Sequence, residues 1–586
     1  MVRIMTIRKT GLVFITATLF AAALLLAQQP APSFVPVTDA MLRTPDPSDW
    51  LMWRRTLDSS GYSPLNSINR TNVSGLTLVW TRPLTLGVQE GTPLVYRGVM
   101  YFPNPLDTLQ AINAVSGDLI WEYKRELPAD LNRYIPFPAI NRTVGIYGNL
   151  IIDTSADNYL VALDAVTGKL AWQTKILDYT RGAQHSGGPL VANGKVFSGR
   201  SCEPEGGPEA CIIAAHDART GRELWRTRLI PAPGEPGNET WGNVPFEERR
   251  QVGSWMTPSY DSDSNLVIVG TSVTAPTPKF MLGGNDKQHL YHNSTLALDG
   301  DTGKIRWYYQ HLVDHWDLDH PFERLLVDTA VRPDRANVPW INPGLRAGER
   351  RRVITGIPGK TGVVYTLDLK TGEFLWARPT VSQTVINSID GKGVVTGNPE
   401  MLFTAAGQQR LVCPSVNGGK NFQAGAYSPQ TNVMYYPLQN SCMNVTSLAE
   451  RATVDGTYAV GFDNRLPAGQ TNAGSLWAIS AETGATLWKY EQRAAMMSVI
   501  ATGGGLLFAG DTNGRFRAFD QVTGKVLWET NLGSAVTGYP ATYSVSGRQY
   551  IAVSTGSAPA AGGSNRMTPD VRTGSANNLY VFALPK

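Results

Sequence analysis

The sequence is poor in cysteine and in the local patterns that bind redox metals. Its 586 residues contain only four cysteines, Cys202, Cys211, Cys413 and Cys442. None lies in a C-x-x-C or C-x-x-C-H arrangement, which excludes a zinc ribbon and a covalently attached c-type haem. Any electrons that the protein handles must therefore leave through a partner. Because 202 and 211 are close in sequence, as are 413 and 442, we expect two disulfides with that pairing.

Charge is also scarce, at 17% of residues, and the formal net charge is only +4. This balance gives no electrostatic argument for nucleic acid, so we expect no such partner. No long helical periodicity is present either. The chain is instead rich in turn-forming residues, with 58 glycines and 38 prolines, which is typical of a β protein.

One long apolar run begins at Gly11 and ends at Ala27, and it follows Arg3, Arg8 and Lys9. A basic segment before an apolar run of this length predicts a signal peptide over residues 1–27, cleaved near Ala27, and a periplasmic location. The alternative is an uncleaved membrane anchor, for which the run is short. No cysteine follows the run, so we do not expect a lipoprotein anchor.

A self-similar phrase recurs along the rest of the chain. Each copy resembles "ALDAVTGKLAW", with the glycine four residues before the tryptophan, and predicts a hairpin with a tight turn. The tryptophan offers a flat surface for docking one blade on the next. The seven copies end at Trp121, Trp172, Trp225, Trp307, Trp376, Trp488 and Trp528, and "GLTLVW" ending at Trp80 is a degenerate eighth copy.

These copies predict an all-β fold, an eight-bladed propeller formed by a single domain over residues 28–586. The intervals 225–307, 307–376 and 376–488 are longer than a bare blade requires, so we expect functional loops there. We expect the strands within 549–582 to complete the ring with the N-terminal segment.

The repeat resembles the tryptophan-docking motif of quinoprotein alcohol dehydrogenases, enzymes that use pyrroloquinoline quinone (PQQ). The likeness to methanol and ethanol dehydrogenases runs from "DWLMWRRTLDSSGYSPLNSIN" at 49–69 to the C-terminus. It implies an eight-bladed propeller with PQQ and a metal ion near its axis. Because fold alone does not establish function, the site residues are compared one by one.

The segment "DHWDLDHP" at 314–321 matches the catalytic segment of that family. The resemblance makes Asp317 the general base that takes the alcohol proton, and also a metal ligand. The alternative is a solvated acidic turn. Asp319 corresponds to an extra carboxylate of lanthanide-using members that membrane glucose dehydrogenases also carry. Oxygen ligands suit Ca²⁺ or a lanthanide ion, so Asp319 does not choose between them.

Other positions correspond to the cofactor contacts of the family. The resemblance implies that PQQ is bound by Glu90, Arg142, Ser186, Trp255, Lys360 and Asn421. Alternatives are a further core tryptophan at Trp255 and a turn lysine at Lys360. The adjacent cysteines of many members are replaced by "PFPAINR". A late active-site tryptophan of the family corresponds to Met496, which suggests a reshaped substrate pocket.

The metal site departs from the family pattern. The position of the metal-binding asparagine falls on Val273, which cannot ligate, so Thr274 or Asp319 must substitute. The metal-binding glutamate corresponds to Glu205, with Glu203 as the alternative. The resemblance thus implies PQQ and one Ca²⁺ or lanthanide ion, with Asp317, Asp319, Thr274 and Glu205 as ligands.

Three functions remain open at this point. The first is a periplasmic PQQ-dependent dehydrogenase that oxidises a small alcohol or another hydroxyl compound. It would pass electrons to a soluble cytochrome c or to membrane quinone. The second keeps the enzyme class and changes the substrate to a sugar or polyol. The third is a non-catalytic propeller that binds partners, because envelope assembly factors share the repeat.

Overall fold

The computed structural model describes residues 34–135, 137, 140–202, 206–275, 277–284, 287–449 and 460–586. The chain divides into two compact units, Met1–Pro36 and Val37–Lys586, and the description below concerns the second. The predicted signal peptide, residues 1–27, lies outside the described residues. Within the described part of the chain, no helix has the length and apolar character needed to cross a membrane.

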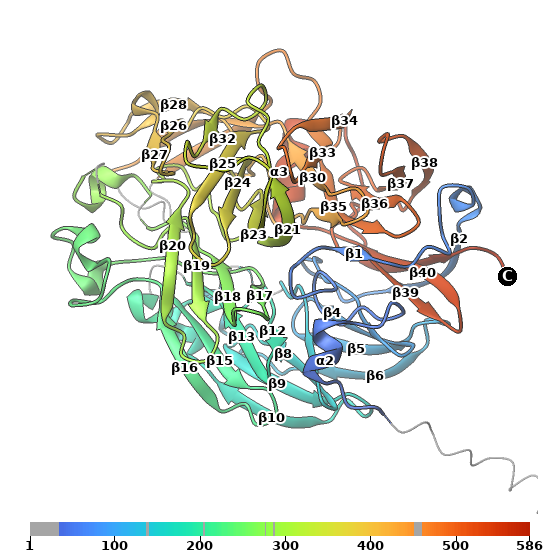
Figure 1. Cartoon of the computed structure of the whole chain (residues 1–586). Coiled ribbons are helices and arrows are strands. Elements are labelled where there is room, and N and C mark those ends of the chain that lie inside the picture. Colours follow the sequence, from blue (N-terminus) through green and yellow to red (C-terminus); the bar gives the residue numbers. More distant parts are fainter. Residues whose placement is uncertain are drawn as a thin grey trace, which may run out of the picture. The chain divides into compact units, whose positions relative to one another are not determined.

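The unit Val37–Lys586 is a β-propeller. Its described residues form eight sheets of four or five strands, which matches the number of tryptophan copies. In Figure 1, β17 and β21 lie toward the middle of the molecule and β6 and β10 toward its rim. The first four sheets in chain order are β3 (Leu94–Tyr96), β4 (Val99–Asn104), β5 (Thr108–Asn113) and β6 (Leu119–Lys124); β7 (Gly145–Tyr147), β8 (Leu150–Thr154), β9 (Tyr159–Asp164) and β10 (Leu170–Lys175); β12 (Leu190–Ala192), β13 (Lys195–Gly199), β15 (Ile212–Asp217) and β16 (Glu223–Arg228); and β17 (Ser259–Asp261), β18 (Leu266–Gly270), β19 (Ser294–Asp299) and β20 (Ile305–Gln310).

The second four sheets contain the two with an added edge strand. They are β21 (Leu325–Val331), β23 (Glu349–Gly356), β24 (Val363–Asp368) and β25 (Phe374–Pro379), with β22 (Trp340–Ile341) at the edge; β29 (Ala426–Ser428), β30 (Val433–Gln439), β33 (Gly474–Ser480) and β34 (Thr486–Gln492); β35 (Met496–Thr502), β36 (Leu506–Asp511), β37 (Arg515–Asp520) and β38 (Val526–Asn531), with β1 (Tyr62–Ser63) at the edge; and β39 (Ala541–Val545), β40 (Arg548–Thr555) and β41 (Asn578–Ala583), with β2 (Thr77–Pro83).

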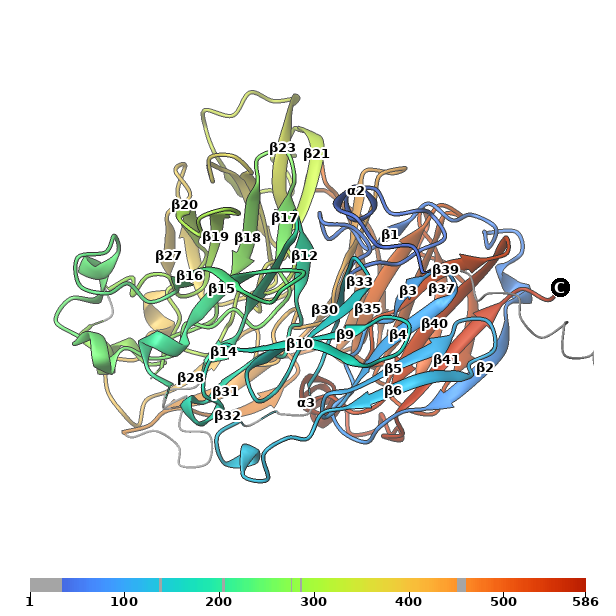
Figure 2. The same cartoon turned by 90° about the horizontal axis from the view of Figure 1, so that it is seen from below.

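The last sheet closes the propeller with strands from both ends of the chain. Strand β2 pairs antiparallel with β41, from Thr77 opposite Ala583 to Pro83 opposite Asn578. Figure 2 shows β2 beside β41 and next to the sheet of β5 and β6. The prediction that the segment 549–582 completes the ring with the N-terminal segment is therefore confirmed. A large buried apolar cluster lies between this sheet and its two neighbours, and contains Trp50 and Phe508.

The repeated tryptophans join each sheet to the next. Six of them donate an indole N–H to a backbone carbonyl of the following sheet at 3.0–3.3 Å: Trp80 to Ala114, Trp121 to Ala165, Trp225 to Gly300, Trp307 to Leu369, Trp488 to Gln521 and Trp528 to Leu76. The ring also packs on the turn glycine of that sheet. A Cβ at Gly303 would lie 2.4 Å from the Trp225 ring, and one at Gly372 would lie 2.5 Å from Trp307. Glycine and tryptophan therefore recur together because they contact one another.

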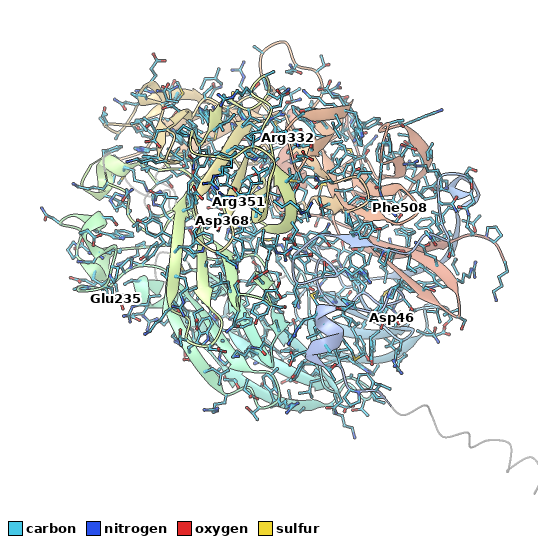
Figure 3. All side chains as sticks on the ribbon, viewed as in Figure 1. Asp46, Glu235, Arg332, Arg351, Asp368 and Phe508 are labelled. Carbon is cyan, nitrogen blue, oxygen red and sulfur yellow. A yellow bond between two sulfur atoms is a disulfide. The ribbon has the colours of Figure 1, made fainter. Side chains whose placement is uncertain are left out.

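The turn before each docking tryptophan is held by a polar side chain. It is an aspartate in most copies, Asn113 in one and Ser480 in another. Asp368 Oδ1 accepts hydrogen bonds from the N–H of Lys370, from the N–H of Thr371 and from the Thr371 hydroxyl. Its other oxygen lies 3.7 Å from Arg351, and the two side chains are labelled in Figure 3. The same aspartate and threonine contacts recur at Asp164, Asp217 and Asp299.

The long intervals carry added elements. The 376–488 interval contains β26 (Ile386–Ile389), β27 (Val395–Gly397), β28 (Gln409–Val412), β31 (Cys442–Ser447) and β32 (Val460–Arg465). The other added elements are helices α2 (Asp39–Arg43) and α3 (Pro559–Met567), strands β11 (Ala183–Gln184) and β14 (Ser201–Cys202), and short 3₁₀ helices that include η8 (Lys279–Leu282). Both predicted disulfides are present, Cys202–Cys211 and Cys413–Cys442.

Candidate active site

The segment 314–321 connects β20 to β21 and is fully buried. Asp314 organises its backbone, because the Asp314 carboxylate accepts hydrogen bonds from the backbone N–H of Trp316, at 2.6 Å, and of Leu318. Asp317 sits between these two donors with a φ of 62°, a left-handed conformation that is uncommon outside glycine. This tight fold presents the carboxylates of Asp317 and Asp319 to the same lysine.

That lysine is Lys360, in the connection between β23 and β24. Its Nζ lies 3.0 Å from Asp317 Oδ1 and 3.3 Å from Asp319 Oδ2, and all three side chains are at least 92% buried. Burial raises the pKa of Asp317 well above its ordinary value, against the opposing effect of Lys360. Burial lowers the pKa of Lys360, but the two carboxylates outweigh it and the net shift is upward. The arrangement is a buried carboxyl with raised proton affinity beside a stable ammonium, which suits proton abstraction.

Four of the predicted cofactor residues form one contact group. The Arg142 guanidinium lies 2.6 Å from Glu90 Oε2, and both side chains are buried. Arg142 also donates to the Ser186 carbonyl at 3.1 Å, and the Ser186 hydroxyl donates to the Trp255 carbonyl at 3.4 Å. The guanidinium carbon lies 5.2 Å from the centre of the Trp255 ring. The structure therefore brings Glu90, Arg142, Ser186 and Trp255 together.

Aromatic and apolar side chains surround this group. Trp255 meets Phe322 edge-to-face at 5.4 Å, and Phe422 lies 5.8 Å from the Arg142 guanidinium carbon. Asn421 precedes Phe422 and donates its side-chain N–H to the Asn417 carbonyl at 3.2 Å. A flat ring system bound here would face an indole, as an aromatic stacking contact requires.

Met496 packs in a different apolar cluster from Trp255, Phe322 and Phe422. Its sulfur accepts a hydrogen bond from Gln492, and its side chain packs near Trp488 in the cluster between β30 and β36. The neighbouring Met497 packs with Trp53, Phe422 and Tyr539. Successive side chains of a strand point to opposite faces, so a one-residue offset in the correspondence moves the methionine of the pocket from 496 to 497. The structure therefore places Met497, and not Met496, in the cluster that includes Trp255, and the reshaped substrate pocket stays a prediction.

Buried polar atoms at this centre test whether the residues fit a polyanionic quinone. In the part of the chain that the structure describes, Arg142 Nε, Gln89 Nε2 and Asn417 Nδ2 are buried without a hydrogen-bond partner. Buried polar groups without partners are uncommon in folded proteins and call for an explanation. These three N–H donors, one of them on the Arg142 guanidinium itself, fit a group that carries carboxylates and carbonyl oxygens.

The predicted metal ligands differ in how well they are placed to bind an ion. Asp319 Oδ1 accepts a hydrogen bond from the Val273 backbone N–H at 3.0 Å, which places the carboxylate beside the loop that contains Thr274. Two carboxylates and a hydroxyl are hard oxygen donors that fit a Ca²⁺ or lanthanide ion. The apolar Val273 side chain supplies nothing, and the Thr274 hydroxyl already accepts from the buried Lys279 ammonium at 2.6 Å. The predicted ligand Glu205 and its alternative Glu203 lie outside the described residues.

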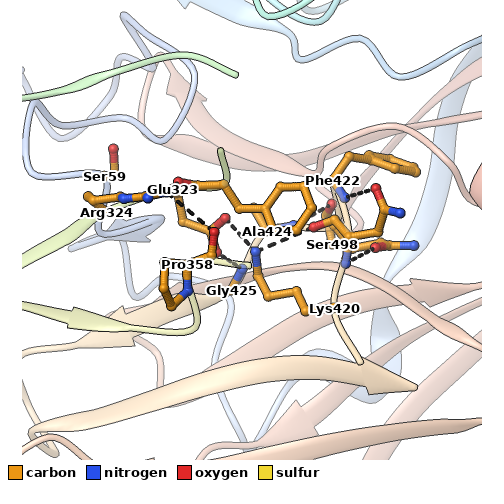
Figure 4. A network of polar contacts seen from close by, with 12 residues as sticks. Ser59, Glu323, Arg324, Pro358, Lys420, Phe422, Ala424, Gly425 and Ser498 are labelled. Atoms are coloured by element: carbon orange, nitrogen blue, oxygen red, sulfur yellow. Dashed lines mark hydrogen bonds and ion pairs between the residues drawn. The ribbon is translucent and has the colours of Figure 1, made fainter. Parts of the chain in front are cut away.

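A second buried charge network, absent from the sequence predictions, lies beneath Phe422 (Figure 4). Lys420 Nζ lies 2.7 Å from Glu323 Oε2 and 4.6 Å from the centre of the Phe322 ring. The other Glu323 oxygen accepts from the Gly425 N–H at 2.9 Å. Burial lowers the pKa of Lys420 to about 8, with Glu323 opposing the shift. The network fixes the loop that holds Asn421.

Two arginines enclose this network and are almost fully buried. Arg54 donates to the Val499 carbonyl at 2.6 Å, and Arg324 donates to the His320 carbonyl at 2.6 Å. Burial lowers their pKa values to about 10 and about 9. The only sequence signal for the network was Lys420 itself, next to the predicted Asn421.

Comparisons with known proteins show which proteins the chain resembles. The sequence profile of the PQQ family, described as "Glucose/ethanol/alcohol dehydrogenase, beta-propeller domain", matches residues 50–388 and 491–551. The dehydrogenase subunit of alcohol dehydrogenase (quinone) from Komagataeibacter europaeus is 30% identical over 556 residues, which cover 88% of this chain and 73% of that protein. The lanthanide-dependent methanol dehydrogenase of Methylacidiphilum fumariolicum is 30% identical over 550 residues, covering 87% of this chain and 85% of that protein.

Solved structures of two dehydrogenases have the same fold as this chain. A europium-containing methanol dehydrogenase superposes with a TM-score of 0.81 at 27% identity, and the match covers 93% of this chain and 100% of that one. The quinohemoprotein alcohol dehydrogenase ADHIIG of Pseudomonas putida gives a TM-score of 0.82 at 27% identity, covering 94% of this chain and 83% of that one.

Proposed function

Because the chain belongs to the family of PQQ-dependent alcohol dehydrogenases, we propose that it oxidises a small primary alcohol, with Asp317 as the general base. The observation that carries the proposal is the buried pair of Asp317 and Lys360, and the buried donors of Arg142, Gln89 and Asn417 without hydrogen-bond partners add support. A non-catalytic scaffold would need the docking tryptophans but not this pair.

In this proposal, Asp317 accepts the proton of the alcohol hydroxyl. A buried carboxylate with a raised pKa takes a proton more readily than an ordinary aspartate, which suits the removal of a hydroxyl proton near neutral pH. The Lys360 ammonium, 3.0 Å away, keeps the carboxylate in place and offers positive charge toward oxygen atoms in the site. Asp317 and Lys360 are both buried, which excludes water from both groups.

PQQ, when bound, supplies the two-electron acceptor for the alcohol carbon. Glu90, Arg142, Ser186, Trp255 and Asn421 would hold it, together with Lys360. The guanidinium of Arg142 suits a carboxylate, and the indole of Trp255 suits the ring plane.

The metal ion and the electron acceptor are further parts of the proposal. We assign a single Ca²⁺ or lanthanide ion to Asp317, Asp319, Thr274 and Glu205, with the oxygen donors as support. The sequence of residues 1–27 supports export to the periplasm, where a soluble cytochrome c or membrane quinone would accept electrons. The absence of a haem attachment motif in the sequence supports an external acceptor.

Dye-linked oxidation by the purified protein tests the function. The protein is supplied with PQQ alone, with PQQ and Ca²⁺, and with PQQ and La³⁺, and a series of primary alcohols is compared with glucose and glycerol. Turnover of alcohols is expected only when PQQ is present. Turnover of glucose or glycerol, without turnover of any simple primary alcohol, would make a sugar or polyol the substrate class. No turnover under any condition would favour the non-catalytic propeller.

A further inference from the structure

The charge network beneath Phe422 carries more positive than negative charge. Among the residues that the structure describes, it contains three cations, Arg54, Arg324 and Lys420, and one carboxylate, Glu323. Each of these four residues is at most 2% exposed. With all four ionised, the network has two positive charges in excess.

The excess lies on the two arginines. Lys420 pairs with Glu323 at 2.7 Å, whereas neither Arg54 nor Arg324 forms an ion pair with any described residue. Both arginines donate to backbone carbonyls instead. In the described part of the chain, Nε and Nη1 of Arg54 are also buried without a hydrogen-bond partner. Buried charges in folded proteins are ordinarily paired, because their desolvation is costly, so this excess suits an anionic ligand.

The network keeps its charge at neutral pH. Burial lowers the pKa of Arg54 to about 10 and that of Arg324 to about 9, so both guanidinium groups stay protonated at pH 7. Burial lowers the pKa of Lys420 to about 8, against the opposing effect of Glu323, so the ammonium is the major form. An anion bound nearby would raise all three pKa values, since it stabilises the charged forms.

The network lies next to the aromatic side chains of the candidate cofactor site. The Lys420 ammonium is 4.6 Å from the centre of the Phe322 ring, and the centre of that ring is 5.4 Å from the centre of the Trp255 ring. The two distances place the ammonium within about 10 Å of Trp255. Phe422, above the network, lies 5.8 Å from the guanidinium carbon of Arg142. Apolar rings separate the network from the site, and a medium of low dielectric constant transmits Coulomb interactions better than water does.

We propose that this network is an electrostatic determinant of cofactor binding, in which the excess positive charge of Arg54 and Arg324 attracts the carboxylates of PQQ. The inference rests on the PQQ binding of the proposed function, and adds to it residues that act through their charge from beneath Phe422. For unit charges about 10 Å apart and an effective dielectric constant of about 20, the loss of one charge weakens binding about tenfold.

Calorimetric titration of the purified protein with PQQ tests the inference. Arg54→Met removes one positive charge and keeps an unbranched side chain, and is expected to weaken PQQ binding about tenfold. Arg324→Met is expected to act in the same direction, and Lys420→Met replaces both if neither arginine variant folds, as checked by circular dichroism. Arg350→Met is the matched control, because Arg350 is exposed on β23, and it is expected to bind PQQ as the wild type does.

A double variant separates charge from packing. Glu323→Gln combined with Lys420→Met breaks the ion pair but leaves the net charge of the network unchanged. The glutamine can still accept from the Gly425 N–H, as Glu323 does. The affinity for PQQ is therefore expected to stay within about twofold of the wild type. If the network acted only by holding the loop of Asn421, this variant would weaken binding as much as Arg54→Met does.

Weaker binding in the arginine variants, with unchanged binding in the double variant and in Arg350→Met, supports the inference. Unchanged binding in a folded arginine variant overturns it, and so does an equal loss in the double variant. In both of these cases PQQ still binds to the wild type, and the proposed function stands. If the wild type binds no PQQ, the inference falls together with the cofactor part of the proposed function.

Discussion

The rim and the centre of the propeller are stabilised in opposite ways. At the rim, six tryptophans make the same neutral hydrogen bond to the next sheet, and the ring rests on a glycine. At the centre, ion pairs such as Asp317–Lys360 and Glu323–Lys420 are buried, and none of them repeats. The contacts at the rim repeat and are built from local sequence, whereas each ion pair at the centre occurs once.

This difference separates stability from function. A neutral hydrogen bond contributes about 0.5–1.5 kcal/mol, and its loss at one blade leaves the others intact. A buried charge that loses its partner cannot be replaced by solvent. The buried ion pairs at the centre therefore lower the stability of the fold. Groups that do so are typically retained for function. The following predictions, in order of expected effect, test the contrast.

The largest effect is expected at Asp317. Asp317→Asn keeps the size of the side chain but removes the base, so the turnover number should fall by about 10²–10⁴, measured by dye-linked alcohol oxidation. PQQ binding should persist. Turnover equal to wild type would mean that another group takes the proton.

Breaking the second ion pair is expected to destabilise the whole fold. Glu323→Ala leaves the Lys420 ammonium buried without its partner, and should lower the free energy of unfolding by about 3–5 kcal/mol, measured by urea denaturation. Glu529→Ala is the control, since Glu529 is partly exposed at the rim and pairs with Arg517. Equal losses in the two variants would remove the distinction between centre and rim.

A buried carboxyl beside Asn141 predicts a pH effect on stability. Burial raises the pKa of Asp153 from 3.8 to about 7, and the Asn141 amide bonds its carboxylate. The protonated form is favoured in the folded state, so this contribution is complete below about pH 4. It is lost as the pH rises through about 7.

The Asp153→Asn variant measures that contribution. Relative to the wild type, it should gain about 1–4 kcal/mol in the free energy of unfolding between pH 4.5 and 7.5, followed by urea denaturation at each pH. A difference that stays constant with pH would show that Asp153 does not titrate in this range.

The smallest effect is expected from one docking contact at the rim. A methyl group at Gly303 would lie 2.4 Å from the Trp225 ring, so Gly303→Ala should cost about 1–3 kcal/mol in the free energy of unfolding. Gly234→Ala is a matched control, because Gly234 also has a positive φ but has open space around it. The same loss in both variants would attribute the cost to backbone conformation and not to the tryptophan.

The rim could be predicted from the sequence because its interactions repeat. The spacing of glycine and tryptophan recurs seven times, and both disulfides join cysteines that are close in the sequence. The centre could be predicted only where it resembles a known family, as at Asp317 and Arg142. Glu323 and Lys420 are 97 residues apart and belong to no repeat, and Lys279 meets Thr274 through an irregular loop. No local pattern in the sequence reports such contacts.

Calorimetric titration of the purified protein with PQQ tests most directly whether the centre of the propeller is a cofactor site. The account predicts saturable binding of one PQQ per chain. It also predicts binding at least about tenfold weaker in Arg142→Met, which loses a charge-assisted contact. Arg226→Met, at the exposed rim, should bind as the wild type does. Equal affinity in Arg142→Met and the wild type, or no binding to the wild type, would contradict the account.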